Sequence, residues 1–473
     1  MEQLNNKWHL PFKLFSISLA LWLVLPSVFQ YGMFMDGKMY SAIAKNIAIN
    51  NGSVWNLIFS KTLFSNFYEH PPLAIFIHSL FYSISESFII DKLYSLLALF
   101  LNITGICFIW KLIYQKDKTL QNYWWLPATL YLSVLLIGWA FKNNMLENTM
   151  SYFCVFSVYF ILKAQLKNKL VYLIPAALLI ILAFLSKGFT GLFPLSIPFF
   201  YSLFFDKMNL KKLTIHTLLL FFFVFCFSMI LFLYKDSNKF LTNYFNKQVV
   251  TSIDGSRGAD NARFFIVTKT FLELIPIFSI CLIVFLISYF KKQLSILTNT
   301  KKKFFLFIAL SATLPILLSP RQSGYYALCA YPFFALAFSQ LIFPQIHFWF
   351  NQLNSNSKKL KIVSGLAGLI LISSIVFSAS KYKHFERDEI VLKDIFEICK
   401  NVPQGEIITI PIEQAQSWTV YAYFSRFGNI SLDYNQGNLH RFYLYDSGNH
   451  AEIPKGYTKI NLKLSRFQLF AKP

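Results

Sequence analysis

The sequence has few charged residues and very few acidic ones. Only 14% of its 473 residues are charged, and 22 Asp and Glu stand against 44 Lys and Arg, which gives a formal net charge of +22. Soluble domains carry about 25% charged residues. Hydrophobic residues make up 55% of the chain, and the mean hydropathy is +0.48. A chain with so few charged residues cannot cover the surface of a soluble globule with polar groups. We therefore expect a polytopic membrane protein.

The sequence also lacks paired cysteines. Of its six Cys, five lie inside apolar runs and one stands alone in a polar segment, and none has metal-ligand spacing, which excludes a disulfide framework and a zinc motif. The excess of basic residues is typical of nucleic-acid binders. Here, however, the Lys residues form short clusters between apolar runs, as topology signals do. We therefore expect no nucleic-acid partner.

Eleven apolar segments are long enough to cross a membrane as helices. They are 11–31, 90–113, 122–141, 149–164, 170–186, 189–205, 213–234, 266–290, 303–319, 323–343 and 361–379. The first is too long for the apolar part of a signal peptide and has no cleavage site after it, so we expect it to be retained. The shorter run 71–85 opens with Pro-Pro, and we expect an interfacial helix there.

The Lys clusters support this count. With 71–85 left out, the clusters of all the short inner connections fall on one side of the membrane, as the positive-inside rule requires. We therefore expect an integral multi-pass protein of the bacterial inner (plasma) membrane, with a cytoplasmic N-terminus and an extracytoplasmic C-terminal domain.

The chain divides into two predicted domains. Residues 1–380 form a transmembrane domain with outer loops 32–89 and 235–265, and residues 381–473 form a small α/β domain. In this tail, 388–401 and 416–427 have helical patterns, whereas 406–411, 429–433 and 440–445 look like strands. The predicted fold class is an all-α polytopic membrane protein with about 11 transmembrane helices plus interfacial helices, and a small extracytoplasmic α/β domain at the C-terminus.

Polar residues near the membrane boundary gather on the predicted outer side. A single Lys or Arg at a span end usually anchors its helix by snorkelling, and a single acid in a turn is usually solvated. Charged groups at membrane depth are nevertheless functional candidates, and here they recur at five separate outer turns. They are Asp36, Glu69 with His70, Glu147, Lys187 and Arg321.

These residue types suit displacement at a sugar carbon with a lipid phosphate as the leaving group. Cations stabilise the negative charge that grows on a departing phosphate, and a carboxylate accepts the proton of an incoming hydroxyl. The low dielectric at the membrane boundary strengthens both effects. A carboxylate could instead hold a divalent cation.

The same residues carry a resemblance to a known family. Asp36-Gly37-Lys38-Met39-Tyr40, Glu69-His70-Pro71-Pro72, Ser186-Lys187-Gly188 and Arg321 with Tyr325-Tyr326 resemble motifs of GT-C class membrane glycosyltransferases. The most similar group is that of the protein O-mannosyltransferases and lipid A aminoarabinose transferases. The likeness runs from about residue 11 to 345.

The resemblance implies a role for each matched residue. It implies that Asp36 and Glu147 are catalytic carboxylates, with Asp36 as the base or the orienter of the acceptor, and that His70, Lys187 and Arg321 bind the donor phosphate. It further implies that Tyr40, Tyr325 and Tyr326 bind substrate, and it matches Glu69 to a position that can hold a divalent metal cation. The loop at 244–248 lacks the His expected as a second ligand of that cation.

The sequence therefore predicts a glycosyltransferase, hexosyl or pentosyl, that uses a polyprenyl-phosphate sugar. It would transfer one sugar, with inversion, to a hydroxyl or phosphate of an envelope glycolipid such as lipid A, or of a protein, on the outer face of the membrane. One alternative is a sugar-lipid transporter or flippase, which should show charge at the bilayer midplane and paired repeats. A catalytically inactive sugar-lipid binding protein is the other.

Overall fold

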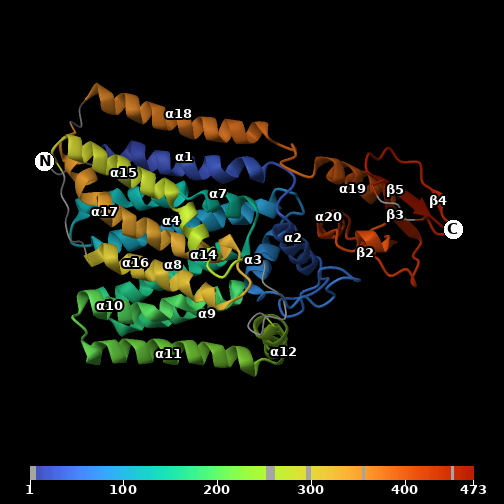
Figure 1. Ribbon diagram of the computed structural model, residues 1–473, viewed down its shortest axis with the longest axis horizontal. Helices are drawn as coiled ribbons and strands as arrows, with labels where there is room; N and C mark the ends of the chain where they lie inside the picture. Colours follow the sequence, from blue (N-terminus) through green and yellow to red (C-terminus); the bar gives the residue numbers. More distant parts are fainter. Residues whose placement is uncertain (1–6, 252–260, 294–299, 354–356, 449–451, 473) are drawn as a thin grey trace.

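The computed structural model describes residues 7–251, 261–293, 300–353, 357–448 and 452–472. A long helical bundle makes up most of the molecule, and the C-terminal domain lies beyond one end of it (Figure 1). Two predicted loops are described only in part, because 252–260 of the outer loop 235–265 and 294–299 of the inner loop 291–303 lie outside the described residues.

Seven helical segments among the described residues are long and apolar enough to cross a membrane. Each coincides with a predicted span. They are α1 (His9–Val28), α4 (Ile90–Ile113), α8 (Leu146–Lys167), η2 (Leu170–Tyr172) with α9 (Leu173–Lys187), α11 (Leu210–Leu233), η6 (Gly324–Ala330) with α17 (Tyr331–Asn351), and α18 (Lys358–Ser380).

Two predicted spans are bent rather than straight. Segment 122–141 falls within α5 (Lys118–Gln121), η1 (Asn122–Trp124), α6 (Trp125–Ser133) and α7 (Leu135–Lys142), and α7 turns by 75° from the helix before it. Segment 266–290 is α14 (Phe265–Glu273) and α15 (Ile275–Phe290), which meet at 46°. The two breaks touch, because the Leu136 N–H at the start of α7 donates to Glu273 Oε2 over 2.8 Å. Glu273 thus satisfies an amide that the break leaves without an intrahelical partner.

The last two predicted spans are shorter helices. Segment 189–205 is η3 (Phe189–Ser196) with α10 (Ile197–Phe205), and 303–319 lies in α16 (Thr300–Thr313) and η5 (Leu314–Leu318). Both run along the bundle, where α10 packs on α11 and α16 (Figure 1). Within the described parts of the chain, at most nine spans pass on length and apolarity, so the count of eleven stays a prediction.

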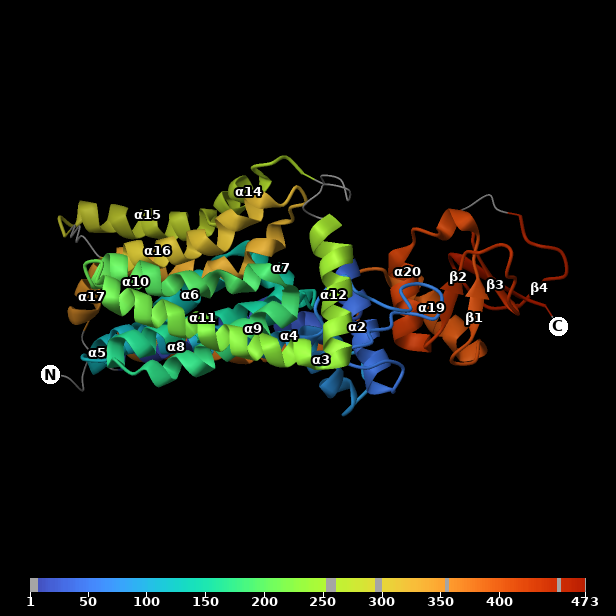
Figure 2. The same ribbon diagram turned by 90° about the horizontal axis from the view of Figure 1, so that it is seen from below.

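Short helices cover the end of the bundle that faces the C-terminal domain. They are α2 (Met35–Ala48), α3 (Leu73–Tyr82), α12 (Lys235–Tyr244) and the π-helical η4 (Phe245–Val250). Both views place α2 between the bundle and the C-terminal domain, and α12 follows at the end of α11 (Figures 1 and 2). The ten residues of α3 are too few to cross a membrane, which agrees with the interfacial helix predicted for 71–85.

The C-terminal domain packs helices against a mixed sheet. Its described helical segments are α19 (Glu389–Asn401), η7 (Ile412–Gln414), α20 (Trp418–Tyr423) and the π-helical η8 (Phe424–Gly428). Strands β1 (Ile407–Thr409), β2 (Ser431–Asp433), β3 (Phe442–Asp446), β4 (Thr458–Lys459) and β5 (Phe467–Ala471) form a sheet in the order β2-β1-β3-β5-β4. β1 is parallel to β2 and β3, whereas β5 is antiparallel to β3 and β4. The predicted strands 406–411, 429–433 and 440–445 correspond to β1, β2 and β3, whereas β4 and β5 are not among the predicted strands.

Candidate active site

A pocket of about 510 Å³ opens where α2, the segment before α3 and η6 meet. It is lined by seven of the nine predicted site residues, which come from three distant parts of the sequence. They are Asp36, Tyr40, Glu69, His70, Arg321, Tyr325 and Tyr326. The fold therefore brings together residues that the sequence shows only as separate outer turns.

The turn between α7 and α8 fixes α2, which carries Asp36. Asn143 Oδ1 accepts a 2.6 Å hydrogen bond from the Phe34 N–H, and Asn144 Nδ2 donates to Ser41 Oγ over 3.3 Å. The backbone of α2 comes so close at Gly37 that a Cβ there would lie 1.9 Å from the Asn143 carbonyl oxygen. Asp36 is consequently held beside the turn from which α8, with Glu147, begins.

Asp36 has the surroundings of a general base. Its Oδ2 accepts a long hydrogen bond, 3.4 Å, from the Tyr325 hydroxyl. Burial raises the pKa of Asp36 above its usual value, although the positive charges of Lys187 and Arg321 oppose the rise. A carboxylate with a raised pKa is a stronger proton acceptor.

Glu147 and Lys187 stand behind the pocket rather than in its lining. Lys187 Nζ lies 3.1 Å from Glu147 Oε1, and the two side chains are 8% and 0% exposed. The same ammonium lies 3.3 Å from His70 Nε2 and 5.8 Å from the ring centres of Tyr40 and Tyr326. Lys187 is therefore paired with Glu147. Its ammonium also lies next to three side chains that line the pocket, those of His70, Tyr40 and Tyr326.

Arg321 is the one Lys or Arg side chain among the described residues that line the pocket. The turn that carries it is held by the buried side chain of Gln322. The Gln322 amide donates to the Arg263 carbonyl over 2.8 Å and accepts from the Ile266 N–H over 3.0 Å. The hydrogen bonds of Gln322 thus hold the backbone of the turn from which the Arg321 side chain lines the pocket.

A divalent metal finds no complete set of ligands in the described chain. Glu69 and His70 both line the pocket, but no group of three His, Cys, Asp or Glu able to hold an ion occurs among the described residues. A metal at Glu69 therefore stays a prediction, and we derive no step through one.

The sequence did not indicate several residues of the pocket lining. Trp418, the first residue of α20 in the C-terminal domain, lines the pocket together with Phe64, Phe67 and Gln248. The rings of Trp418 and Phe64 stack with centres 5.7 Å apart. No local motif marks Trp418, because only the tertiary fold brings it next to Phe64.

A second cavity, of about 350 Å³, adjoins the pocket. It shares Phe34 and Tyr325 with the pocket and is also lined by Leu135 and Trp139 of α7 and by Glu273 of α14. Leu135 is 70% exposed at the end of the bundle. This side cavity therefore lies next to the pocket, and its lining combines apolar side chains, such as the exposed Leu135, with the charged pair Lys269 and Glu273.

Comparisons with known proteins agree with this architecture. Residues 69–232 match the family model of dolichyl-phosphate-mannose-protein mannosyltransferase. The crystal structure of ArnT from Cupriavidus metallidurans bound to undecaprenyl phosphate has a TM-score of 0.63 and 11% identity, with 97% of each chain covered. The apo form of ArnT gives 0.64 and 12%, again with 97% of each chain covered.

A more distant structure has the same fold. The oligosaccharyltransferase AglB from Archaeoglobus fulgidus, in complex with an inhibitory peptide and a dolichol-phosphate, gives a TM-score of 0.53 and 13% identity, with 93% of this chain and 69% of AglB covered. No curated protein matches the chain in sequence. The chain has the fold of GT-C membrane glycosyltransferases, as its sequence resemblance predicts.

Proposed function

We propose that the protein transfers a single sugar from a polyprenyl-phosphate-linked donor to a hydroxyl or phosphate of an acceptor, at the end of the bundle next to the C-terminal domain. The acceptor is an envelope glycolipid such as lipid A, or a protein, and the anomeric carbon is inverted. The likeness to ArnT and AglB supports a lipid phosphate as the carrier, because those structures hold undecaprenyl phosphate and dolichol-phosphate, respectively.

One observation carries the proposal. Asp36 and Arg321 line the same pocket, and that pocket adjoins a side cavity whose lining includes the exposed Leu135. An acid that can take a proton and a cation that can hold a phosphate therefore share one space. A donor can place its head group there while its hydrocarbon chain remains in the bilayer.

The reaction follows from these two groups. Asp36 accepts the proton of the acceptor hydroxyl as the hydroxyl oxygen forms a bond to the anomeric carbon. The bond between that carbon and the phosphate oxygen breaks on the opposite face, and its electron pair leaves with the polyprenyl phosphate. Arg321 stabilises the charge on the leaving phosphate. A single displacement inverts the anomeric centre.

The remaining predicted residues support this arrangement from the pocket wall. The buried pair of Glu147 and Lys187 holds a positive charge next to His70 and behind the rings of Tyr40 and Tyr326. Lys187 therefore acts on the pocket through its electric field and through His70. In this proposal it is a positioning residue, whereas Arg321 makes the contact with the phosphate.

The test is transfer by the purified protein in lipid nanodiscs. Undecaprenyl phosphates that carry mannose, glucose or 4-amino-4-deoxyarabinose are offered as donors, with lipid A or a Ser/Thr-rich peptide as the acceptor, and mass spectrometry identifies the product. We expect one donor to give an acceptor heavier by one sugar residue. A protein that moves the donor between leaflets but forms no product would instead support the transporter.

A further inference from the structure

The C-terminal domain contributes a wall of the catalytic pocket through Trp418. The indole ring stacks on Phe64 at an interplanar angle of 23°, and Phe67 meets Phe64 edge-on, with ring centres 5.9 Å apart. All three rings line the pocket. The indole N–H donates to Gln416 Oε1 over 3.2 Å. Because this hydrogen bond already satisfies the polar group of the ring, Trp418 lines the pocket with the apolar part of the indole.

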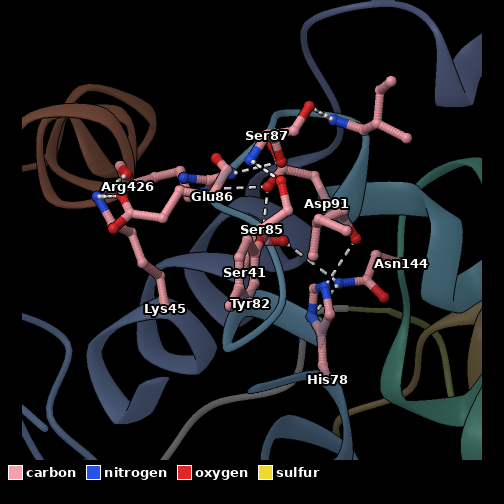
Figure 3. Close-up of polar contacts among 12 residues, drawn as sticks. Ser41, Lys45, His78, Tyr82, Ser85, Glu86, Ser87, Asp91, Asn144 and Arg426 are labelled. Carbon is pink, nitrogen blue, oxygen red and sulfur yellow. Dashed lines mark hydrogen bonds and ion pairs between the residues drawn. The ribbon is translucent and has the colours of Figure 1, made fainter. Parts of the chain in front are cut away.

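A buried ion pair holds the helix that carries this ring. Arg426, eight residues after Trp418 and only 3% exposed, places Nε 2.6 Å from Asp91 Oδ1 of α4. Its second nitrogen donates to the carbonyls of Glu86 and Ser87, each over 3.1 Å. Figure 3 shows Arg426 reaching from its helix towards Asp91 and lying beside Tyr82. Loss of one partner of a buried pair is costly, so this contact fixes the domain on the bundle.

A second set of contacts ties the same helix to α2. Lys38 forms an ion pair with Asp388, which also accepts a 2.8 Å hydrogen bond from the Tyr423 hydroxyl, and the Lys38 ammonium lies 4.3 Å from the centre of the Tyr423 ring. Further along α2, Lys45 donates to the Arg426 carbonyl over 3.1 Å. Since α2 also carries Asp36, the catalytic acid and Trp418 sit on elements that are joined directly.

The lining of the pocket comes from two parts of the molecule. Arg321, Ser323 and Tyr325 belong to the bundle, and the side cavity shares Tyr325 with the pocket. In the proposed reaction Arg321 holds the phosphate of a donor whose hydrocarbon chain stays in the bilayer. Trp418 comes from the domain beyond the bundle (Figure 1), so it borders the space that the donor leaves for the acceptor.

We propose that Trp418, with Phe64, forms the acceptor-binding face of the pocket and determines acceptor specificity by stacking on the C–H face of a sugar ring. Aromatic rings supply large, flat apolar surfaces for such contacts. This inference rests on the proposed transfer reaction, and it assigns to the C-terminal domain a direct part in substrate selection.

The experiment compares Trp418→Ala and Trp418→Phe with the wild type in nanodiscs. Tyr434→Ala is the matched control, because Tyr434 is an aromatic residue of the same domain, 41% exposed, that does not line the pocket. With the donor saturating, Trp418→Ala should raise the KM for the acceptor about tenfold. Trp418→Phe, which keeps a flat ring, should recover most of the loss. Native mass spectrometry should find the affinity for undecaprenyl phosphate unchanged in every variant.

Three results would overturn the proposal. Trp418→Ala kinetics equal to those of Tyr434→Ala would remove Trp418 from the acceptor site. A loss of affinity for undecaprenyl phosphate in Trp418→Ala would assign the ring to the donor. A wild-type protein that transfers no sugar would contradict the proposed function itself and this inference with it, and that failure is recognised because it precedes any substitution.

Discussion

At the scale of the residue, the account depends most on Asp36. Asp36→Asn removes the proton acceptor but keeps the size of the side chain and its place at the start of α2. Because general-base catalysis contributes roughly 10²–10⁴-fold, we expect kcat to fall by about that factor with little change in donor affinity. Single-turnover rates with a saturating donor measure it. Activity within about threefold of the wild type would remove Asp36 from the mechanism.

The same carboxyl predicts an unusual dependence of stability on pH. Burial raises the pKa of Asp36, so its contribution to stability is present below the pKa of the unfolded chain and is lost as the pH rises through the folded-state pKa. Asp36→Asn should therefore be as stable as the wild type or more stable at pH 7, and this advantage should shrink at acidic pH. Unfolding temperatures in detergent at pH 4 and pH 7 provide the check, and a variant clearly less stable at pH 7 would contradict it.

Two cations that look alike in the sequence should behave differently. Arg321→Met should lower turnover and weaken undecaprenyl phosphate binding. Arg321→Lys should recover only part of the turnover and of the binding, because an ammonium cannot replace a bidentate guanidinium.

Lys187→Met leaves Glu147 buried without its partner, so we expect a loss of about 3–5 kcal/mol of stability. Adding Glu147→Gln should restore part of that loss. Equal stability of Lys187→Met and wild type would contradict the buried pair.

At the scale of the element, the close packing of α2 on the turn before α8 can be tested with glycine. Gly37→Ala would place a Cβ 1.9 Å from the Asn143 carbonyl oxygen, so α2 must shift and carry Asp36 with it. We expect a loss of both activity and stability. Gly365→Ala in α18 is the control, because nothing lies within 4 Å of that Cβ, and it should be neutral or stabilising by up to about 1 kcal/mol. Similar behaviour of the two variants would contradict this packing.

The sequence predicts where apolar helices occur better than how they run. Apolar length places α1, α4 and α18 well, but it carries no information on direction, so the 75° turn within 122–141 could not be foreseen. The Leu136 amide at that turn donates its hydrogen bond to Glu273, which is more than a hundred residues away in the sequence. In the C-terminal domain, β4 has only two residues, both exposed, and such a strand leaves no alternating pattern to read.

At the scale of the whole molecule, cysteine labelling tests on which side of the membrane each connection and the C-terminal domain lie. The Lys clusters predict that the C-terminal domain lies outside and that the connection 291–303 lies inside. Cysteines introduced at 239 and 459 should react with an impermeant maleimide on intact cells, and cysteines at 291 and 303 only after permeabilisation. Labelling of 291 from outside would invert the topology and place the pocket on the cytoplasmic side.

The site shows the same division between what a sequence reveals and what only the fold reveals. Charges at separate turns on one predicted side were sufficient to gather Asp36, His70 and Arg321, because topology alone brings such turns to one end. The pairing of Lys187 with Glu147 and the approach of Trp418 depend on the tertiary packing of α8, α9 and α20, which periodicity does not encode.

The proposed displacement is tested by measuring both of its products and their configuration in one experiment. The purified protein is incubated in nanodiscs with a polyprenyl-phosphate sugar and its acceptor, and the free polyprenyl phosphate and the glycosylated acceptor are quantified together, with NMR to assign the new anomeric centre. The account predicts equal amounts of the two products, inverted configuration, and loss of both in Asp36→Asn. Retained configuration, release of polyprenyl phosphate without a glycosylated acceptor, or undiminished transfer by Asp36→Asn would contradict it.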